Sequence, residues 1–171
     1  MGGANLWKVL WDYHKKIENM FTRYSKGHTN LLNLILNEIE VYMAIEEEVV
    51  YPGIGNVAGS WVEQSQDQLD LMKELSADIQ NLEPGDPAEA KLVRRLEKVF
   101  LLHAEREQKS MFGVIKHKGV LEHESYDMAR AAFTVRQELV AARGSGSPST
   151  QYFIGLPNSG WTKSLVPGGG W

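Results

Sequence analysis

Hydrophobic residues recur every three or four positions along residues 5–143, the spacing that places them on one side of an α-helix. The pattern predicts four long amphipathic helices, over about residues 5–24, 29–51, 60–82 and 88–117. A fifth segment, about residues 121–143, is rich in alanine and less sharply patterned. Four amphipathic helices with short links pack most simply as an up-down-up-down four-helix bundle. The predicted class is therefore all-α, with an additional C-terminal helix.

Glycine and proline separate the predicted helices. The first helix should end at Gly27, and the fourth should follow a turn at residues 84–87. Pro52 and the glycines after it should end the second helix. Ser60, with Glu63 three residues on, has the spacing of a capping box and should begin the third helix.

The composition changes abruptly after Arg143. Of the 28 residues from 144 to 171, seven are Gly, three are Pro, five are Ser, and only Lys163 is charged. Large apolar residues follow the flexible-linker sequence GSGSPS: Tyr152, Phe153, Ile154, Leu156, Trp161, Leu165 and Trp171. We therefore predict a helical domain over residues 1–143 and an irregular tail over 144–171. The tail either packs on the bundle, binds a protein partner or a second copy of the chain, or is an added extension.

Charge and cysteine content exclude several functions. The 171 residues contain 18 Lys plus Arg against 22 Asp plus Glu, a net charge of −4, which gives no basic surface for nucleic acid or anionic membranes. The absence of cysteine excludes disulfides, thiolate zinc sites, iron–sulfur clusters and a cysteine nucleophile. No apolar run approaches the roughly 18 residues of a membrane span, so we expect a cytoplasmic protein.

Four polar residues fall on the apolar stripes of the predicted helices: His14, Glu46, His103 and Glu107. Tyr42 precedes Glu46 by four residues, as His103 precedes Glu107, so each pair shares one helix face, about 6 Å apart along the axis. Burying two unpaired carboxylates is costly unless they are protonated or meet a cation, and no Lys or Arg lies on the same stripes near that level. The missing positive charge is best supplied by a metal ion. Nitrogen and oxygen donors without sulfur favour iron or manganese, with zinc as a further alternative.

Two alternatives to this metal site come from the same residues. A single histidine on an apolar face is most often a core histidine, and an inward glutamate near a helix end often reaches solvent through its long side chain.

A ferritin-like di-iron site is excluded, because none of the five histidines has a glutamate three residues before it.

At these positions the chain resembles the hemerythrin family, specifically the HHE cation-binding domains, over about residues 6–116. The resemblance rests on the stretches DYHKKIENMF, IEVYMAIEEEVVYP and LHAEREQKSMF, which begin at residues 12, 39 and 102. It implies a non-haem iron site, di-iron or mononuclear, with manganese or zinc less favoured. The ligands carried over from the family pattern are His14, Glu46, His103 and Glu107.

The chain departs from the family pattern at two positions. Tyr42 stands where the second helix of the family has a histidine, and Gln68 (or Leu69, in a register shifted by one) stands where the third helix has one. Tyr42 is either a phenolate ligand of ferric iron or a core tyrosine whose hydroxyl bonds to Glu46. Fewer nitrogen donors favour redox chemistry or metal storage over reversible oxygen carriage.

The resemblance implies a protein that handles O2, peroxide or nitric oxide in an oxidative-stress setting, as an iron oxidoreductase, or one that stores or senses iron. The alternative is a bundle that has lost its metal and acts as a binding or cargo module through the tail. These residues are compatible with two metal ions, with one or with none.

Overall fold

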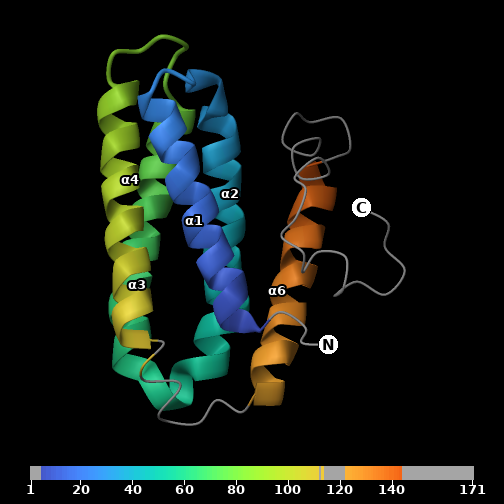
Figure 1. Ribbon diagram of the computed structural model, residues 1–171. Coiled ribbons are helices and arrows are strands. Elements are labelled where there is room, and N and C mark those ends of the chain that lie inside the picture. The colour runs from blue at the N-terminus through green and yellow to red at the C-terminus, as the bar shows by residue number, and fades with distance from the viewer. Residues whose placement is uncertain (1–4, 112, 114–121, 144–171) are drawn as a thin grey trace. The chain divides into compact units, whose positions relative to one another are not determined.

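The computed structural model describes residues 5–111, 113 and 122–143, and every regular element in that part of the chain is a helix (Figure 1). The elements are α1 (Leu6–Ser25), η1 (Thr29–Leu31), α2 (Leu32–Ile45), η2 (Glu46–Val50), α3 (Tyr51–Gln80), α4 (Glu89–Arg106), η3 (Glu107–Met111) and α6 (Glu122–Arg143). The predicted all-α class is confirmed. The up-down-up-down topology and the domain limits stay predictions, and the tail at 144–171 lies outside the described residues.

The chain forms two compact units. Unit 1 runs to Gly53 and resumes at Val120, so it contains α1, α2, η2 and α6. Unit 2 runs from Ile54 to Gly119 and contains most of α3, together with α4 and η3.

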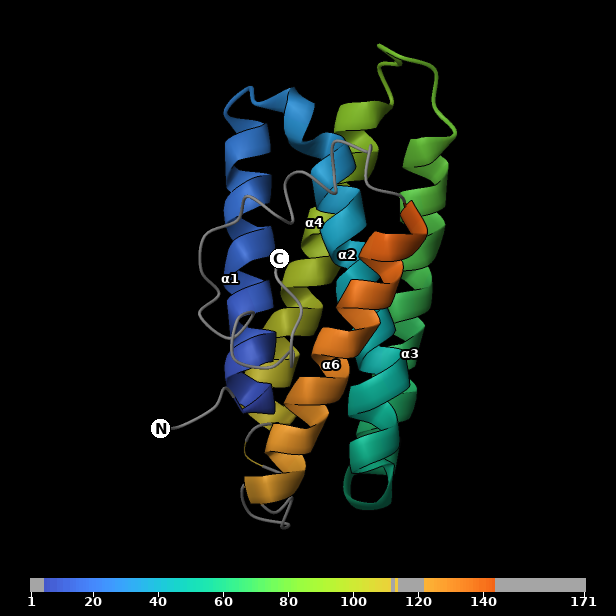
Figure 2. The ribbon, with the colours of Figure 1, turned by 90° about the vertical axis from the view of Figure 1, so that its right-hand side faces the viewer.

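Three helices pack together in unit 1. Helices α1 and α2 lie side by side (Figure 1), and α6 packs on both (Figure 2). The Leu6 backbone N–H donates a 3.1 Å hydrogen bond to Ser125 Oγ, which ties the start of α1 to α6. A Cβ atom at Gly53 would overlap the thioether end of the Met128 side chain, so a larger residue there would require that side chain of α6 to move.

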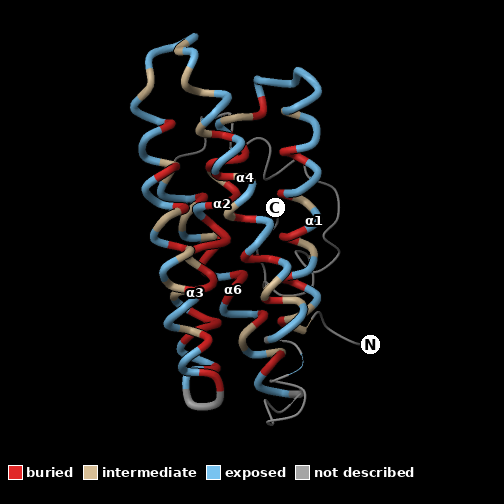
Figure 3. Tube along the Cα trace, turned by 90° about the vertical axis from the view of Figure 1, so that its left-hand side faces the viewer, coloured by how far each residue is buried: buried red, intermediate tan, exposed pale blue. Residues whose placement is uncertain are grey.

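Local signals explain where α1 begins and ends. The Asn5 side chain accepts a 3.0 Å hydrogen bond from the Lys8 backbone N–H, which satisfies one of the unpaired donors of the first turn. Gly27 follows the helix with a φ of 102°, a conformation that favours glycine. Between these limits buried positions recur every three or four residues, so one side of the helix is buried and the other is exposed (Figure 3).

The predicted end of the second helix at Pro52 and the following glycines is wrong. The backbone stays helical through them, and the break comes at Ala58, where φ is −142° and ψ is 31° inside α3. Pro52 is separated from η2 by one residue, so the helical backbone continues into α3 through a residue that has no N–H to donate. The break lies close to Ser60, the predicted start of the third helix. Gly85, with a φ of 84°, confirms the predicted turn before α4.

No helix in the described ranges combines the length and the apolarity that a membrane crossing requires.

Unit 1 contains a buried network of charged groups. The Glu38 side chain is completely buried, with Lys16 Nζ at 2.7 Å and Arg136 Nη1 at 3.5 Å from its carboxylate oxygens. Arg136 Nη1 also donates a 2.7 Å hydrogen bond to the Tyr13 hydroxyl. The network joins α1, α2 and α6, so one carboxylate and its cations hold three helices together.

Replacing Arg136 by alanine should destabilise the protein by about 3 kcal/mol, because the change removes one partner of a buried ion pair. The matched control is Arg130→Ala on the same helix, since Arg130 is exposed and pairs with exposed Asp127. That change should cost less than about 0.5 kcal/mol. Urea unfolding followed by circular dichroism measures both values, and equal losses would contradict the role of the network.

Candidate metal centre

Unit 1 contributes three of the predicted metal ligands. His14 comes from α1, Tyr42 comes from α2, and Glu46 is the first residue of η2; all three are buried. His14 Nε2 lies 3.1 Å from the Tyr42 hydroxyl, and the two rings meet edge to face with their centroids 5.5 Å apart. The structure therefore brings His14 and Tyr42 together. This hydroxyl bonds to His14, whereas the core-tyrosine alternative expected a bond to Glu46.

The bond between His14 and Tyr42 has a consequence for metal binding. One proton lies between the phenol oxygen and the imidazole nitrogen, whichever of the two atoms carries it. A metal ion accepts lone pairs from deprotonated ligands. The two side chains can therefore bind a metal through these two atoms only after releasing that proton.

Unit 2 contributes two more predicted ligands. His103 lies in the last turn of α4, and Glu107 begins η3 directly after it; both side chains are completely buried. They stand four residues apart on consecutive helical turns, as the sequence predicts. His103 and Glu107, like Glu46 of unit 1, each offer a buried ligand atom of a type that can hold a metal ion.

The structure describes both residues that the sequence offers at the family's third-helix histidine position. Leu69 is completely buried, whereas the neighbouring Gln68 is half-buried. Gln68 Oε1 lies 3.1 Å from His103 Nδ1, so this amide contacts a predicted ligand. The sequence indicates a lost histidine here, but it contains no signal for the new hydrogen bond.

A π-helix begins at each buried glutamate. Glu46 starts η2 and Glu107 starts η3, and each π-helix is five residues long. π-Helical turns are rare and are frequent at functional sites. A π-helix therefore begins at the glutamate that ends each of the two patterns, Tyr42-x-x-x-Glu46 and His103-x-x-x-Glu107. Helical periodicity in the sequence does not reveal this repetition.

The charged network of unit 1 lies beside its candidate ligands. The Tyr13 ring centroid is 6.2 Å from that of Tyr42. Burial raises the pKa of Tyr13 to about 12, although Arg136 opposes the change. Burial likewise lowers the pKa of Lys16 to about 8, although the negative charge of Glu38 acts to raise it. Sequence periodicity missed this cluster, because Glu38 and Arg136 are 98 residues apart.

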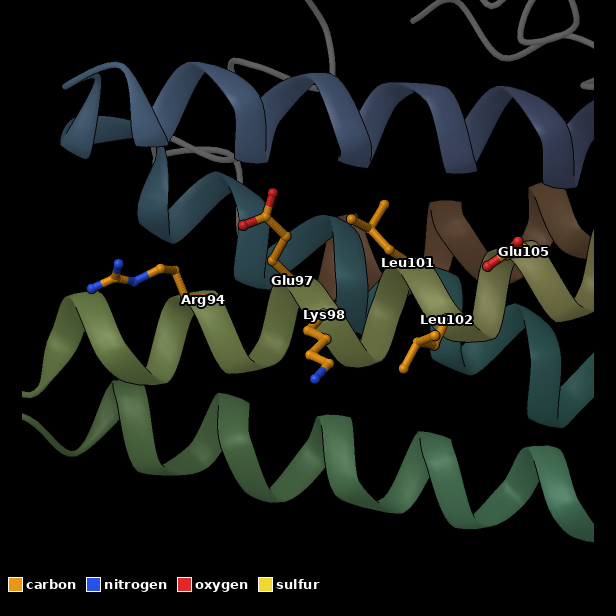
Figure 4. Close-up of a pocket in the computed structure, with 6 residues that line it drawn as sticks. All are labelled: Arg94, Glu97, Lys98, Leu101, Leu102 and Glu105. Carbon is orange, nitrogen blue, oxygen red and sulfur yellow. The ribbon is translucent and has the colours of Figure 1, made fainter.

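A shallow pocket on α4 contains none of the predicted ligands (Figure 4). It is lined by Arg94, Glu97, Lys98, Leu101, Leu102 and Glu105. Leu101 and Leu102 are 36% and 50% exposed. This pocket is a feature of the helix surface, whereas His103 on the same helix is buried.

A family model for the hemerythrin HHE cation-binding domain matches residues 5–115. The chain belongs to the hemerythrin family. The match spans all five predicted ligands and Gln68, and it ends before α6 begins. No curated protein and no solved structure matches the chain. Membership in the hemerythrin family confirms the resemblance inferred from sequence, and α6 is a helix beyond the matched domain.

The raised pKa of Tyr13 makes stability depend on pH in the alkaline range. An unfolded tyrosine ionises near pH 10, whereas Tyr13 in the folded protein keeps its proton to about pH 12. Between these values the unfolded state binds fewer protons, so the stability that Tyr13 contributes is lost as pH rises. Urea unfolding at pH 9, 10 and 11 should show wild type losing stability faster than Tyr13→Phe, by about 1 kcal/mol per pH unit above pH 10. Parallel losses in the two proteins would contradict this assignment.

Proposed function

We propose that this hemerythrin domain binds one or two iron ions and uses them in reactions with peroxide, O2 or nitric oxide, or in iron storage or sensing. The five proposed ligands are His14, Tyr42, Glu46, His103 and Glu107. The observation that carries the proposal is the pair of completely buried His103 and Glu107 on successive turns, within a domain of a cation-binding family.

The chemistry of the donors fits iron. Imidazole nitrogen combined with carboxylate oxygen is the donor set of non-haem iron sites. The chain contains no cysteine that would favour zinc or an iron–sulfur cluster. Manganese is also compatible with these donors. Metal analysis of the purified protein would distinguish the two ions.

The side chains would divide the work of holding the metal. Glu46 and Glu107 would supply negative charge, and His103 would supply a neutral nitrogen donor. His14 and Tyr42 would release their shared proton, leaving a phenolate that favours the ferric state. Burial of all five side chains excludes bulk water from these groups. Bound iron would supply the Lewis-acid and redox chemistry.

A second candidate function is binding of a protein partner or a second copy of the chain through residues 144–171. The tail has many large apolar residues and one charge, a composition more typical of a binding segment than of a solvated tail. The hemerythrin match ends at residue 115, so the C-terminal part of the chain lies beyond the matched domain.

Iron content tests the proposed ligands directly. Untagged protein reconstituted anaerobically with ferrous iron should contain one or two irons per chain. Glu46→Gln and Glu107→Gln should each weaken iron binding by at least about tenfold, because each change removes a charged donor. Metal analysis after gel filtration measures the retained iron.

Matched controls lie beside both glutamates. Glu48 and Glu105 are exposed neighbours of Glu46 and Glu107, so Glu48→Gln and Glu105→Gln should leave iron content unchanged. Normal iron content in Glu46→Gln or Glu107→Gln would remove that residue from the site. Only trace iron in the wild-type protein would overturn the iron proposal and favour the binding module.

Tyr42 has its own spectroscopic test. A tyrosinate bound to ferric iron gives a visible charge-transfer band, so the oxidised protein should be coloured and Tyr42→Phe should lose the colour. Tyr126→Phe, at a half-buried position of α6, is the control and should keep the band. Persistence of the band in Tyr42→Phe would show that Tyr42 is not a ligand.

A further inference from the structure

We infer that Gln68 is a positioning residue that fixes the tautomer and orientation of His103, so that His103 Nε2 presents its lone pair. This inference rests on the proposed function in one respect, namely that Nε2 is the atom that binds the metal. The hydrogen bond and the tautomer are properties of unit 2 alone and can be tested without any metal.

The hydrogen bond determines where the imidazole proton lies. Gln68 Oε1 is 3.1 Å from His103 Nδ1. An amide oxygen can only accept a hydrogen bond, so Nδ1 must carry the proton that is donated. A neutral imidazole has one such proton, so Nε2 is unprotonated in this tautomer and carries a lone pair that a metal ion can accept.

Neighbouring side chains on α3 restrict the orientation of the same ring. Trp61 precedes Gln68 by seven residues, about two helical turns, so both residues lie on one face of α3. The Trp61 ring centroid is 6.4 Å from that of His103, with the planes inclined by 49°. Trp61 is itself covered by the Arg106 guanidinium, 5.8 Å from its centroid, and Arg106 donates a hydrogen bond to Gln64.

These contacts give Gln68 a role other than that of a ligand. A glutamine side chain whose oxygen faces Nδ1 holds the histidine from the side opposite to Nε2. Partners of this kind, which bond to the second nitrogen of a metal-binding histidine, typically change metal affinity by about 10- to 100-fold. The lost third-helix donor is thus replaced by support for a donor on α4.

The first experiment measures the tautomer in metal-free protein. Long-range ¹H–¹⁵N NMR at pH 8 should show His103 with its proton on Nδ1, and the His103→Asn variant identifies the signal. Gln68→Leu removes the acceptor and should move the population toward the Nε2–H tautomer. Gln68→Glu restores an acceptor and should restore the wild-type tautomer. Gln66→Leu is the control, because Gln66 bonds to Asp70 on the same helix.

The second experiment measures affinity for ferrous iron under anaerobic conditions. Gln68→Leu should weaken binding by about 10- to 100-fold, whereas Gln68→Glu and Gln66→Leu should stay within a fewfold of wild type. The thermal midpoint of each variant separates this effect from unfolding.

The outcomes separate the two proposals. A wild-type His103 with its proton on Nε2, or a tautomer unchanged in Gln68→Leu, overturns the inference about Gln68 even if iron binds normally. An unchanged iron affinity in Gln68→Leu also overturns it. Failure of the wild-type protein to bind iron, with the expected tautomer present, overturns the proposed function and the metal-directed role of Gln68 with it.

Discussion

A carboxyl group removed from water must either keep its proton or meet a positive charge, and the three completely buried glutamates of the described residues make this the governing constraint of the protein. At Glu38 the compensation is visible, since Lys16 and Arg136 reach its oxygens from α1 and α6. At Glu46 and Glu107 we propose that a metal cation supplies the charge. The family to which the chain belongs is named for cation binding, and the proposed metal would be a second solution to the same electrostatic requirement within one chain.

Helical periodicity predicted a helix correctly where residues close in sequence determine its two ends. The first helix was expected over residues 5–24 and extends over Leu6–Ser25, because the Asn5 cap and Gly27 define its ends locally. The boundary near Pro52 was wrong, because the helical backbone continues from η2 into α3 through Pro52 and the glycines after it. Proline and glycine indicate where a helix can end, whereas the break at Ala58 depends on how the chain packs.

The candidate site was predictable as far as it depends on spacing within a helix. His103 and Glu107, four residues apart, are both buried as their stripe positions indicate. Contacts between distant segments were not predictable: Glu38 pairs with Arg136 across 98 residues, and Gln68 reaches His103 across 35. A hydrophobic stripe shows which face of a helix is buried but not which polar group meets it there.

The wide turns that start at Glu46 and Glu107 change how the chain tolerates length variation. A π-turn holds one residue more than an α-turn, so it acts as a one-residue insertion in the helix; η2 is such an insertion between α2 and α3. Deleting a residue from an ordinary α-helix rotates everything beyond it by about 100° relative to what precedes it. Within residues 46–50 or 107–111 the same deletion would convert the wide turn to a regular one. The π-helix η2 is thus a place where the chain can lose one residue and keep α2 and α3 joined, although the deletion would change the direction of the Glu46 side chain.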